Sequence, residues 1–206
     1  MRIRSLLWLV AALAVLAGLA VFLGLRSYRV FTEEELVAIV RCEPIPGGSV
    51  PKGISSKGGH YRFLLLYTPV TRGVSGITES FPMQGDQWMV GGDFLKWHPW
   101  LNLLGIKNRH KLTRLSSRYL KIEEEKAGPR SVYELNGGTD LLWQNLYRVG
   151  HWVPFVEAVY GNAAYTFATP GSQWGIYVTH SGYLIKPQAL FSGTKPKSRL
   201  VPESML

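Results

Sequence analysis

The chain opens with one uninterrupted apolar run, residues 6–25, which has no polar side chain among its 20 positions. At about 1.5 Å per residue, a helix of this length measures about 30 Å, the thickness of a hydrocarbon core. The run predicts a single transmembrane helix within an N-terminal anchor of residues 1–30. A cleaved signal peptide is the alternative, because Ala14, Ala17 and Ala20 are small, but the apolar stretch continues beyond them.

Two small residues in this run mark a candidate contact face. Ala14 and Gly18 lie four positions apart, so they share one side of the predicted helix. This spacing lets a second membrane helix approach closely. We interpret Ala14 and Gly18 as a candidate helix-packing site, which makes another membrane protein a candidate partner and leaves the oligomeric state open.

After the anchor the pattern changes to short runs of alternating apolar and polar positions. Residues 61–67 show it most clearly, because Tyr61, Phe63, Leu65 and Tyr67 fall on one face, as in a half-buried strand. The other β-prone runs are 36–41, 77–83, 87–90, 94–97, 112–122, 131–135, 156–160, 163–168, 173–179 and 183–185. This spacing predicts a mainly β domain, an antiparallel sandwich or small barrel, over residues 31–187.

Turn residues define the connections. Gly85 with Asp86 predicts a tight hairpin between two strands, and Gly91 with Gly92 predicts a bend or bulge. The Gly- and Pro-rich residues 44–59 predict a long exposed loop, and residues 188–206 predict an extended or disordered tail.

One stretch of the domain has helical periodicity instead. Thr139 has the character of an N-cap, Leu142, Leu146 and Val149 fall on one stripe, and Gly150 ends the pattern. The sequence therefore predicts one short α-helix within the β-rich domain.

The charge of the chain separates into an anchor part and a domain part. The formal net charge is +9, and four arginines flank the apolar run, which leaves 19 basic against 14 acidic residues in the domain. These are scattered rather than gathered in a stripe, a distribution that argues against nucleic acid as a partner. The amino terminus, Arg2 and Arg4 on one side of the helix are nearly balanced by Arg26 and Arg29 on the other. The closer spacing of the first group and the acidic residues 33–35 beyond the helix favour a cytoplasmic N-terminus under the positive-inside rule, and a cytoplasmic domain is the alternative. We expect a bacterial inner-membrane protein with a periplasmic domain.

Chemistry-bearing residues are sparse. Cys42 is the single cysteine, so the chain forms no disulfide within itself and no thiolate metal site. We found no nucleotide-binding, zinc-protease or nucleophile-elbow motif, and we predict no cofactor and no bound metal. Asp86 and Asp93, across the predicted hairpin, are weak candidates for acid–base catalysis if folding brings His151 to them.

An aromatic segment, residues 94–105 (FLKWHPWLNLLG), has a different character. Trp97, Trp100 and Leu101 lie close to Lys96, a combination typical of a loop that enters a membrane interface or the groove of a partner. The alternative is that these side chains pack inward. We predict that Trp97, Trp100, Leu101 and Lys96 form a partner or membrane contact.

Four segments carry a resemblance: GDQWMVGGDFLKW, LGIKNRHKLTRLSSRYL, RSVYEL and AVYGNAAYTF. Across residues 85–186 the chain resembles a group of uncharacterised bacterial membrane-anchored proteins that carry the label "multidrug transporter" or "cation/multidrug efflux pump". Because a pump lines its path with several helices and this chain supplies one, the resemblance implies an accessory subunit.

Three functions follow from these observations. The first is a non-catalytic, membrane-anchored envelope protein, an accessory or partner-binding subunit of a membrane complex. The alternatives are a hydrolase-like envelope enzyme that uses Asp86, Asp93 and a histidine, and a small-ligand binder with a pocket inside a β-barrel.

Overall fold

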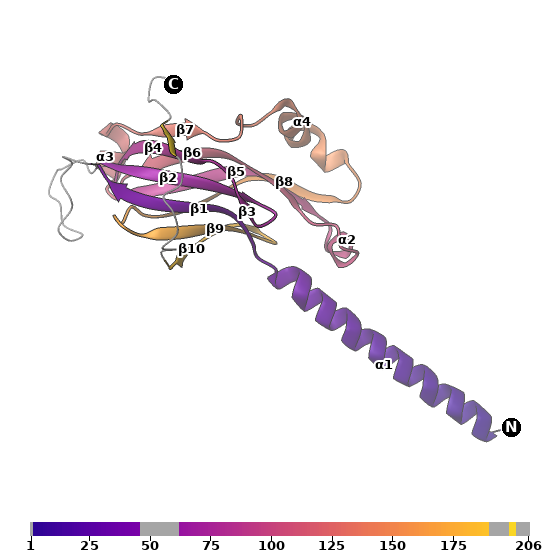
Figure 1. The fold of residues 1–206 in the computed structure, drawn as a ribbon. Coiled ribbons are helices and arrows are strands. Elements are labelled where there is room, and N and C mark those ends of the chain that lie inside the picture. The colour runs from indigo at the N-terminus through magenta and orange to yellow at the C-terminus, as the bar shows by residue number, and fades with distance from the viewer. Residues whose placement is uncertain (1, 46–61, 190–197, 201–206) are drawn as a thin grey trace.

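The computed structural model describes residues 2–45, 62–189 and 198–200 of the 206-residue chain. Helix α1 (Arg2–Thr32) projects from a folded domain (Figure 1). Its segment Leu6–Thr32 is long and apolar enough to cross a membrane, and none of its most apolar window is buried. A core helix of a soluble domain buries such a surface, so this helix has the character of the predicted anchor, and it extends two residues past position 30.

The domain consists of two sheets (Figure 1). The larger has the order β10-β9-β1-β2-β4-β11, with β3 paired to β2, and the smaller has the order β7-β6-β5-β8. Larger-sheet strands are β1 (Glu35–Pro44), β2 (Arg62–Thr71), β3 (Val74–Ser75), β4 (Thr78–Gln84), β9 (Gln173–Thr179), β10 (Gly182–Gln188) and β11 (Ser198–Leu200). The smaller sheet holds β5 (Gln87–Trp97), β6 (Arg109–Arg118), β7 (Val132–Glu134) and β8 (Val156–Phe167). Apart from the parallel β4–β11 pair, the described pairs are antiparallel. The predicted mainly β fold is confirmed.

The core lies between the sheets. Phe63, Leu65 and Tyr67 of β2 are buried on one face, as their alternation predicts, and they pack in one cluster with Trp88 and Val90 of β5. Tyr61, the fourth member of that predicted face, lies outside the described residues. Since the interior is filled by side chains, the domain is a packed sandwich rather than a hollow barrel.

The predicted hairpin at Gly85 and Asp86 is wrong. Strand β4 pairs with β2, whereas β5 pairs with β6 and β8, so this turn carries the chain from one sheet to the other. Backbone contacts fix the crossing, because Asp86 N donates to Arg118 O (3.0 Å) and Ala168 N donates to Asp86 O (3.0 Å). The bulge predicted at Gly91 and Gly92 is confirmed by a register shift between them.

Three short helices adjoin the sheets, besides the 3-10 turn η1 (Gly150–Trp152): α2 (Pro99–Leu103), α3 (Ile122–Ala127) and α4 (Leu141–Val149). The strand predicted over 112–122 ends at Arg118, and the last residue of that prediction belongs to the start of α3. Glu125 of α3 holds this turn, because its Oε2 accepts a hydrogen bond from Tyr119 N (2.7 Å).

Helix α4 differs from its prediction in two respects. Its N-cap is Asp140 rather than Thr139, since Asp140 Oδ1 accepts a hydrogen bond from Trp143 N (3.1 Å). Trp143 is also the buried residue of the helix, whereas Leu142 and Val149 of the predicted stripe are exposed. Because Trp143 has the largest apolar side chain of α4, the face of the helix that carries it packs on the domain. Of the predicted loop and tail, residues 46–61, 190–197 and 201–206 lie outside the described residues.

Candidate functional site

The last turns of α1 are bound to the domain. Arg26 Nε donates a hydrogen bond to Leu103 O of α2 (2.7 Å). Further along the helix, Phe31 places its ring edge-on to His180 in the β9–β10 turn, with 4.6 Å between ring centroids. These contacts join segments far apart in the sequence and connect the end of α1 to two separate parts of the domain.

Residues 97–108, which we term the α2 tip, form the part of the domain beside that end of α1 (Figure 1). Asn102 is buried, and its Nδ2 donates to Ile106 O (2.7 Å) and Asn108 Oδ1 (3.1 Å). The same Asn108 oxygen accepts a hydrogen bond from Trp97 N (3.1 Å). Two asparagine side chains therefore close the α2 tip into a fixed shape.

The predicted contact residues of this segment have different surroundings. Trp100 is 47% exposed and Trp97 is half-buried. Leu101 is buried, so the expectation that it forms part of an exposed surface is wrong. Successive residues of a helix point about 100° apart, so when Trp100 faces outward Leu101 packs inward. Lys96 Nζ is paired with Glu157 Oε1 (2.8 Å).

Sequence reasoning missed an aromatic neighbour of the α2 tip. Phe155, 52% exposed, lies edge-on to Trp100 with 5.5 Å between centroids, and its carbonyl accepts a hydrogen bond from His98 N (2.9 Å). Phe155 has φ +79°, an unusual conformation for a bulky residue. The exposed residues Trp152 and Val153 precede it. Because Phe155 lies in an irregular connection, no periodicity pointed to it.

Two of the three candidate catalytic residues, Asp86 and Asp93, lie apart from each other. Asp86 lies just before the start of β5 and Asp93 lies past the middle of that strand, so seven residues of extended chain separate them by roughly 20 Å. Asp86 Oδ2 instead accepts a hydrogen bond from Leu120 N (2.9 Å). The expected Asp86–Asp93 pair is therefore wrong, because it depended on the hairpin that the chain does not form. The His151 side chain lies outside the described part of the chain.

Asp93 has well-defined partners of its own. It is 5% exposed, and its carboxylate accepts hydrogen bonds from Tyr147 Oη (2.8 Å) and Thr139 Oγ1 (2.9 Å). Burial, followed by the Asp93 contact, raises the pKa of Tyr147 well above its ordinary value. Burial likewise raises the pKa of the neighbouring Tyr183. The tyrosines therefore stay neutral donors, and the cluster ties α4 and the residue before its N-cap to β5.

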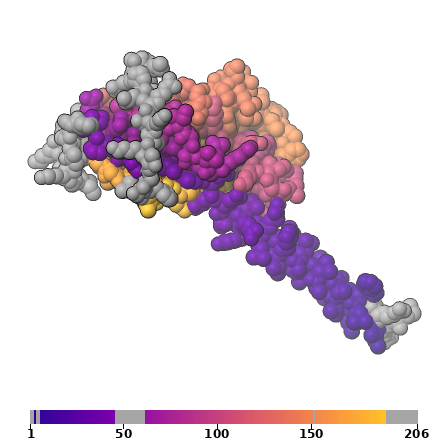
Figure 2. Space-filling model, in the orientation of Figure 1, coloured from indigo at the N-terminus to yellow at the C-terminus, as the bar shows by residue number. Residues whose placement is uncertain are grey.

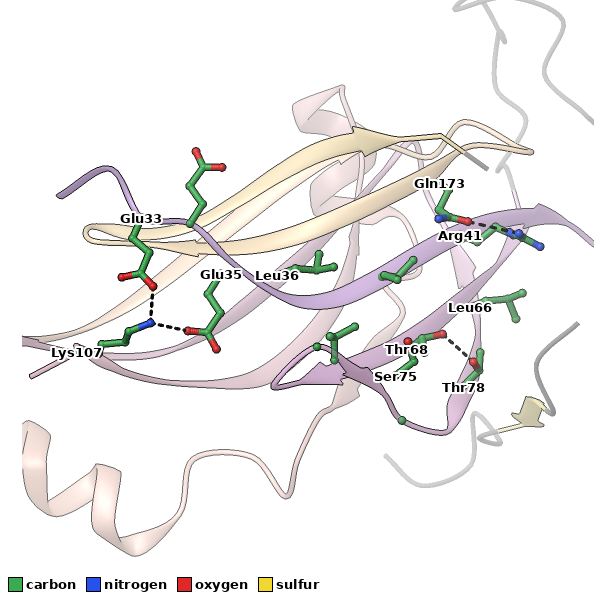
Figure 3. A pocket seen from close by; sticks show the side chains of 15 residues that line it. Glu33, Glu35, Leu36, Arg41, Leu66, Thr68, Ser75, Thr78, Lys107 and Gln173 are labelled. Atoms are coloured by element: carbon green, nitrogen blue, oxygen red, sulfur yellow. Dashed lines mark hydrogen bonds and ion pairs between the residues drawn. The ribbon is translucent and has the colours of Figure 1, made fainter. Parts of the chain in front are cut away.

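A groove of about 810 Å³ lies on the larger sheet (Figure 3). Leu36, Ile39, Leu66 and Val70 give it an apolar floor, and Thr68 with Thr78 adds a hydroxyl pair (2.7 Å). Glutamates 33–35 line one end. Because this groove lies on a sheet rather than between the two sheets, it is not the interior pocket that the ligand-binding alternative predicts.

The ionic groups at the ends of the groove are already paired. Lys107 Nζ contacts Glu33 Oε1 (2.5 Å), and at the other end Arg41 Nη2 donates to Gln173 Oε1 (3.4 Å). Figure 3 shows both contacts. Glu34, which also lines the groove, is paired with Lys186 (2.6 Å), a residue that is not among the lining residues. The groove therefore offers apolar and hydroxyl surface more than free charge.

Outside these sites, the titratable groups of the described residues are not gathered in one place. Among the described residues, no group of three His, Cys, Asp or Glu side chains has the geometry to hold a metal ion. Burial lowers the pKa of His110 and raises that of Cys42 to about 12, so both are neutral near pH 7. In α1, Ala14 and Gly18 are exposed, and nothing lies within 4 Å of a Cβ placed on Gly18.

Comparison with known proteins gives little similarity. No family model matches the chain, and no solved structure matches it. Cytochrome b of Cepaea nemoralis is 34% identical over 95 residues, which cover 46% of this chain and 24% of that protein. The chain thus matches about a quarter of the length of this curated relative, and the similarity does not establish a family.

Proposed function

We propose that this chain is a non-catalytic, single-pass protein of a bacterial inner membrane, an accessory subunit that holds a rigid β-sandwich at the membrane surface. The observation that carries the proposal is the combination of an exposed apolar helix with a fixed joint to the domain, through Arg26–Leu103 and Phe31–His180. A rigid joint means that a partner of the helix also orients the domain.

The partner is another membrane helix on the face of Ala14 and Gly18. Gly18→Leu fills that face, and Gly24→Leu makes the same change on a different face, again with nothing within 4 Å of the added Cβ. In blue-native gels of mild-detergent extracts, we expect Gly18→Leu to reduce the complex about tenfold, equal to about 1.4 kcal/mol. Gly24→Leu leaves the complex unchanged. Equal losses in both variants, or a wild-type chain that migrates alone, would contradict the proposal.

The domain lies on the periplasmic side, because positive charge concentrates before the apolar run of residues 6–25, and Glu33, Glu34 and Glu35 follow α1. Alkaline phosphatase, which is active only after export, is expected to be active when fused after Leu206. A fluorescent protein that folds only in the cytoplasm is expected to be dark in the same position. The reverse pattern places the domain in the cytoplasm.

The groove favours a second candidate function, a binder of small apolar molecules with hydroxyl-bonding groups, because its volume lies within the usual range for ligand sites. Leu66→Trp fills the groove, while Leu64, on the same strand face, is not among the lining residues and serves as the control. Native mass spectrometry of the purified chain is expected to show a bound small molecule that Leu66→Trp removes and Leu64→Trp retains. A chain that carries no such molecule excludes this function.

A further inference from the structure

The α2 tip lies beside the residue that follows the apolar run of α1. The last residue of the apolar run is Leu25, and the next residue, Arg26, donates its hydrogen bond to Leu103 O. A Cβ on Gly105 would lie 3.5 Å from Arg26 Nη2, so this whole turn stands beside that guanidinium. In Figure 2 the segment around residue 100 lies beside the domain end of α1. An arginine that directly follows a transmembrane run sits among the lipid headgroups.

The side chains exposed at this level are apolar and aromatic. Leu104 is 70% exposed, and Ile106 and Trp100 are exposed beside it. In water this patch is unfavourable, since each buried methylene contributes about 0.8 kcal/mol. At the boundary of headgroups and acyl chains, exposed Trp and Leu side chains are favoured.

The patch is also held in a fixed shape. Phe155 lies edge-on to Trp100, and its strained backbone is fixed by the hydrogen bond from His98 N. A non-glycine residue at φ +79° costs about 1–3 kcal/mol, a cost that points to function when the residue carries an exposed aromatic ring. The covalent link between α1 and the domain and the contact at Arg26 keep the patch next to the bilayer.

We propose that Trp100, Leu104, Ile106 and Phe155 form an interfacial foot that enters the headgroup–acyl boundary of the same bilayer that α1 spans. The occupant of this surface is lipid, because a protein partner would have to displace the headgroups that already surround Arg26. The proposal rests on the proposed membrane anchor, and it assigns a second membrane contact that fixes the tilt of the domain.

The test uses the full chain in lipid nanodiscs, with a polarity-sensitive fluorophore on Leu104→Cys. Ile122→Cys in α3 is the matched control, because Ile122 is 67% exposed and lies beyond the opposite end of β6 from the α2 tip. The native Cys42 is buried and its thiol is neutral, so it does not compete for the label. We expect a blue-shifted emission at position 104, and quenching by nitroxide lipids about threefold stronger than at position 122.

Each outcome decides the proposal. Water-like emission at position 104, or quenching equal to that at position 122, overturns it. Flotation of vesicles at alkaline pH measures the anchor separately, since a chain that does not float refutes the anchor, whereas one that floats with an unquenched label refutes the foot alone. In native membranes, a photoreactive residue at position 104 is expected to cross-link to lipid, and cross-linking chiefly to one protein would show a protein groove instead.

Discussion

At Asp93, a buried carboxylate is bound by two hydroxyl groups, from Tyr147 and Thr139. Hydrogen bonds to a charged acceptor contribute about 1.5–3 kcal/mol each when buried, so this arrangement stabilises the domain without any reaction. A catalytic carboxylate needs access to substrate, and Asp93 has almost none. The side chain that the sequence suggested for catalysis is therefore explained by its structural contacts.

Replacement of the two aspartates is expected to have unequal effects on stability. Asp93→Ala leaves two hydroxyl donors unpaired and lowers the free energy of unfolding by about 3 kcal/mol, whereas Asp86→Ala loses a single contact to Leu120 N and costs about 1 kcal/mol. Urea unfolding of the full chain in detergent measures both. In a double-mutant cycle, Tyr147→Phe should couple to Asp93→Ala, and additive effects would show that the pair contributes nothing.

Alkaline pH is expected to destabilise the domain through its buried tyrosines. Burial raises the pKa of Tyr67 from 10.0 to about 12, so the folded state holds this proton more tightly than the unfolded state. The resulting stability is fully present below about pH 10 and is lost as pH rises toward about 12, with a limit of about 3 kcal/mol. Unfolding midpoints between pH 9 and pH 12 test this. Tyr67→Phe should make the dependence shallower, with Tyr147 and Tyr183 supplying the remainder, and the exposed Tyr28→Phe should leave it unchanged.

Among the elements, the position of each strand was easier to predict than the identity of the strand with which it pairs. Phe63, Leu65 and Tyr67 alternate because one face of β2 meets the core, and a local pattern is sufficient to show that. The turn at Gly85 and Asp86 looks the same in sequence whether the next strand pairs with the last or crosses to another sheet. That choice depends on contacts with Arg118 and Ala168, which are distant in sequence. Pairing therefore lay beyond what local pattern determines.

The bulge in β5 makes a sharp prediction for two adjacent glycines. A Cβ at Gly92 would lie 2.1 Å from Lys111 O and 2.7 Å from the Tyr183 hydroxyl, whereas at Gly91 its nearest neighbours are 3.7 Å away. Gly92→Ala therefore forces β5 away from β6 and should lower the free energy of unfolding by about 3 kcal/mol, while Gly91→Ala should lower it by less than about 1 kcal/mol. Thermal unfolding of the full chain compares them, and equal losses would argue against this backbone approach.

For the whole molecule, the sequence showed the anchor and the β domain but not how they are joined. Twenty apolar residues predict a spanning helix by length alone. The contacts of Arg26 with Leu103 and of Phe31 with His180 pair residues about 80 and 150 positions apart, and neither pair leaves a periodic signal. The exposed residues of the α2 tip likewise resemble core residues in a sequence, because lipid and protein interior select the same apolar side chains.

The joint makes the orientation of the domain testable. With spin labels on Leu23→Cys in α1 and Ile122→Cys in α3, we expect a narrow distance distribution in the chain with its native joint. Phe31→Ala with Arg26→Ala removes both described contacts, and we expect the distribution to broaden about twofold as the domain gains freedom relative to α1. Tyr28→Ala, which truncates an exposed ring on the same helix, serves as the control. Pulsed electron–electron double resonance measures the width of each distance distribution.

Three outcomes are possible in this experiment. If all three chains give the same width, then the direction of α1 is set by the interfacial foot or by the chain connection rather than by these contacts. If the control broadens as much as the double variant, the helix end itself has frayed. The expected result, broadening in the double variant alone, would show that two side-chain contacts carry the orientation of α1 into the sandwich.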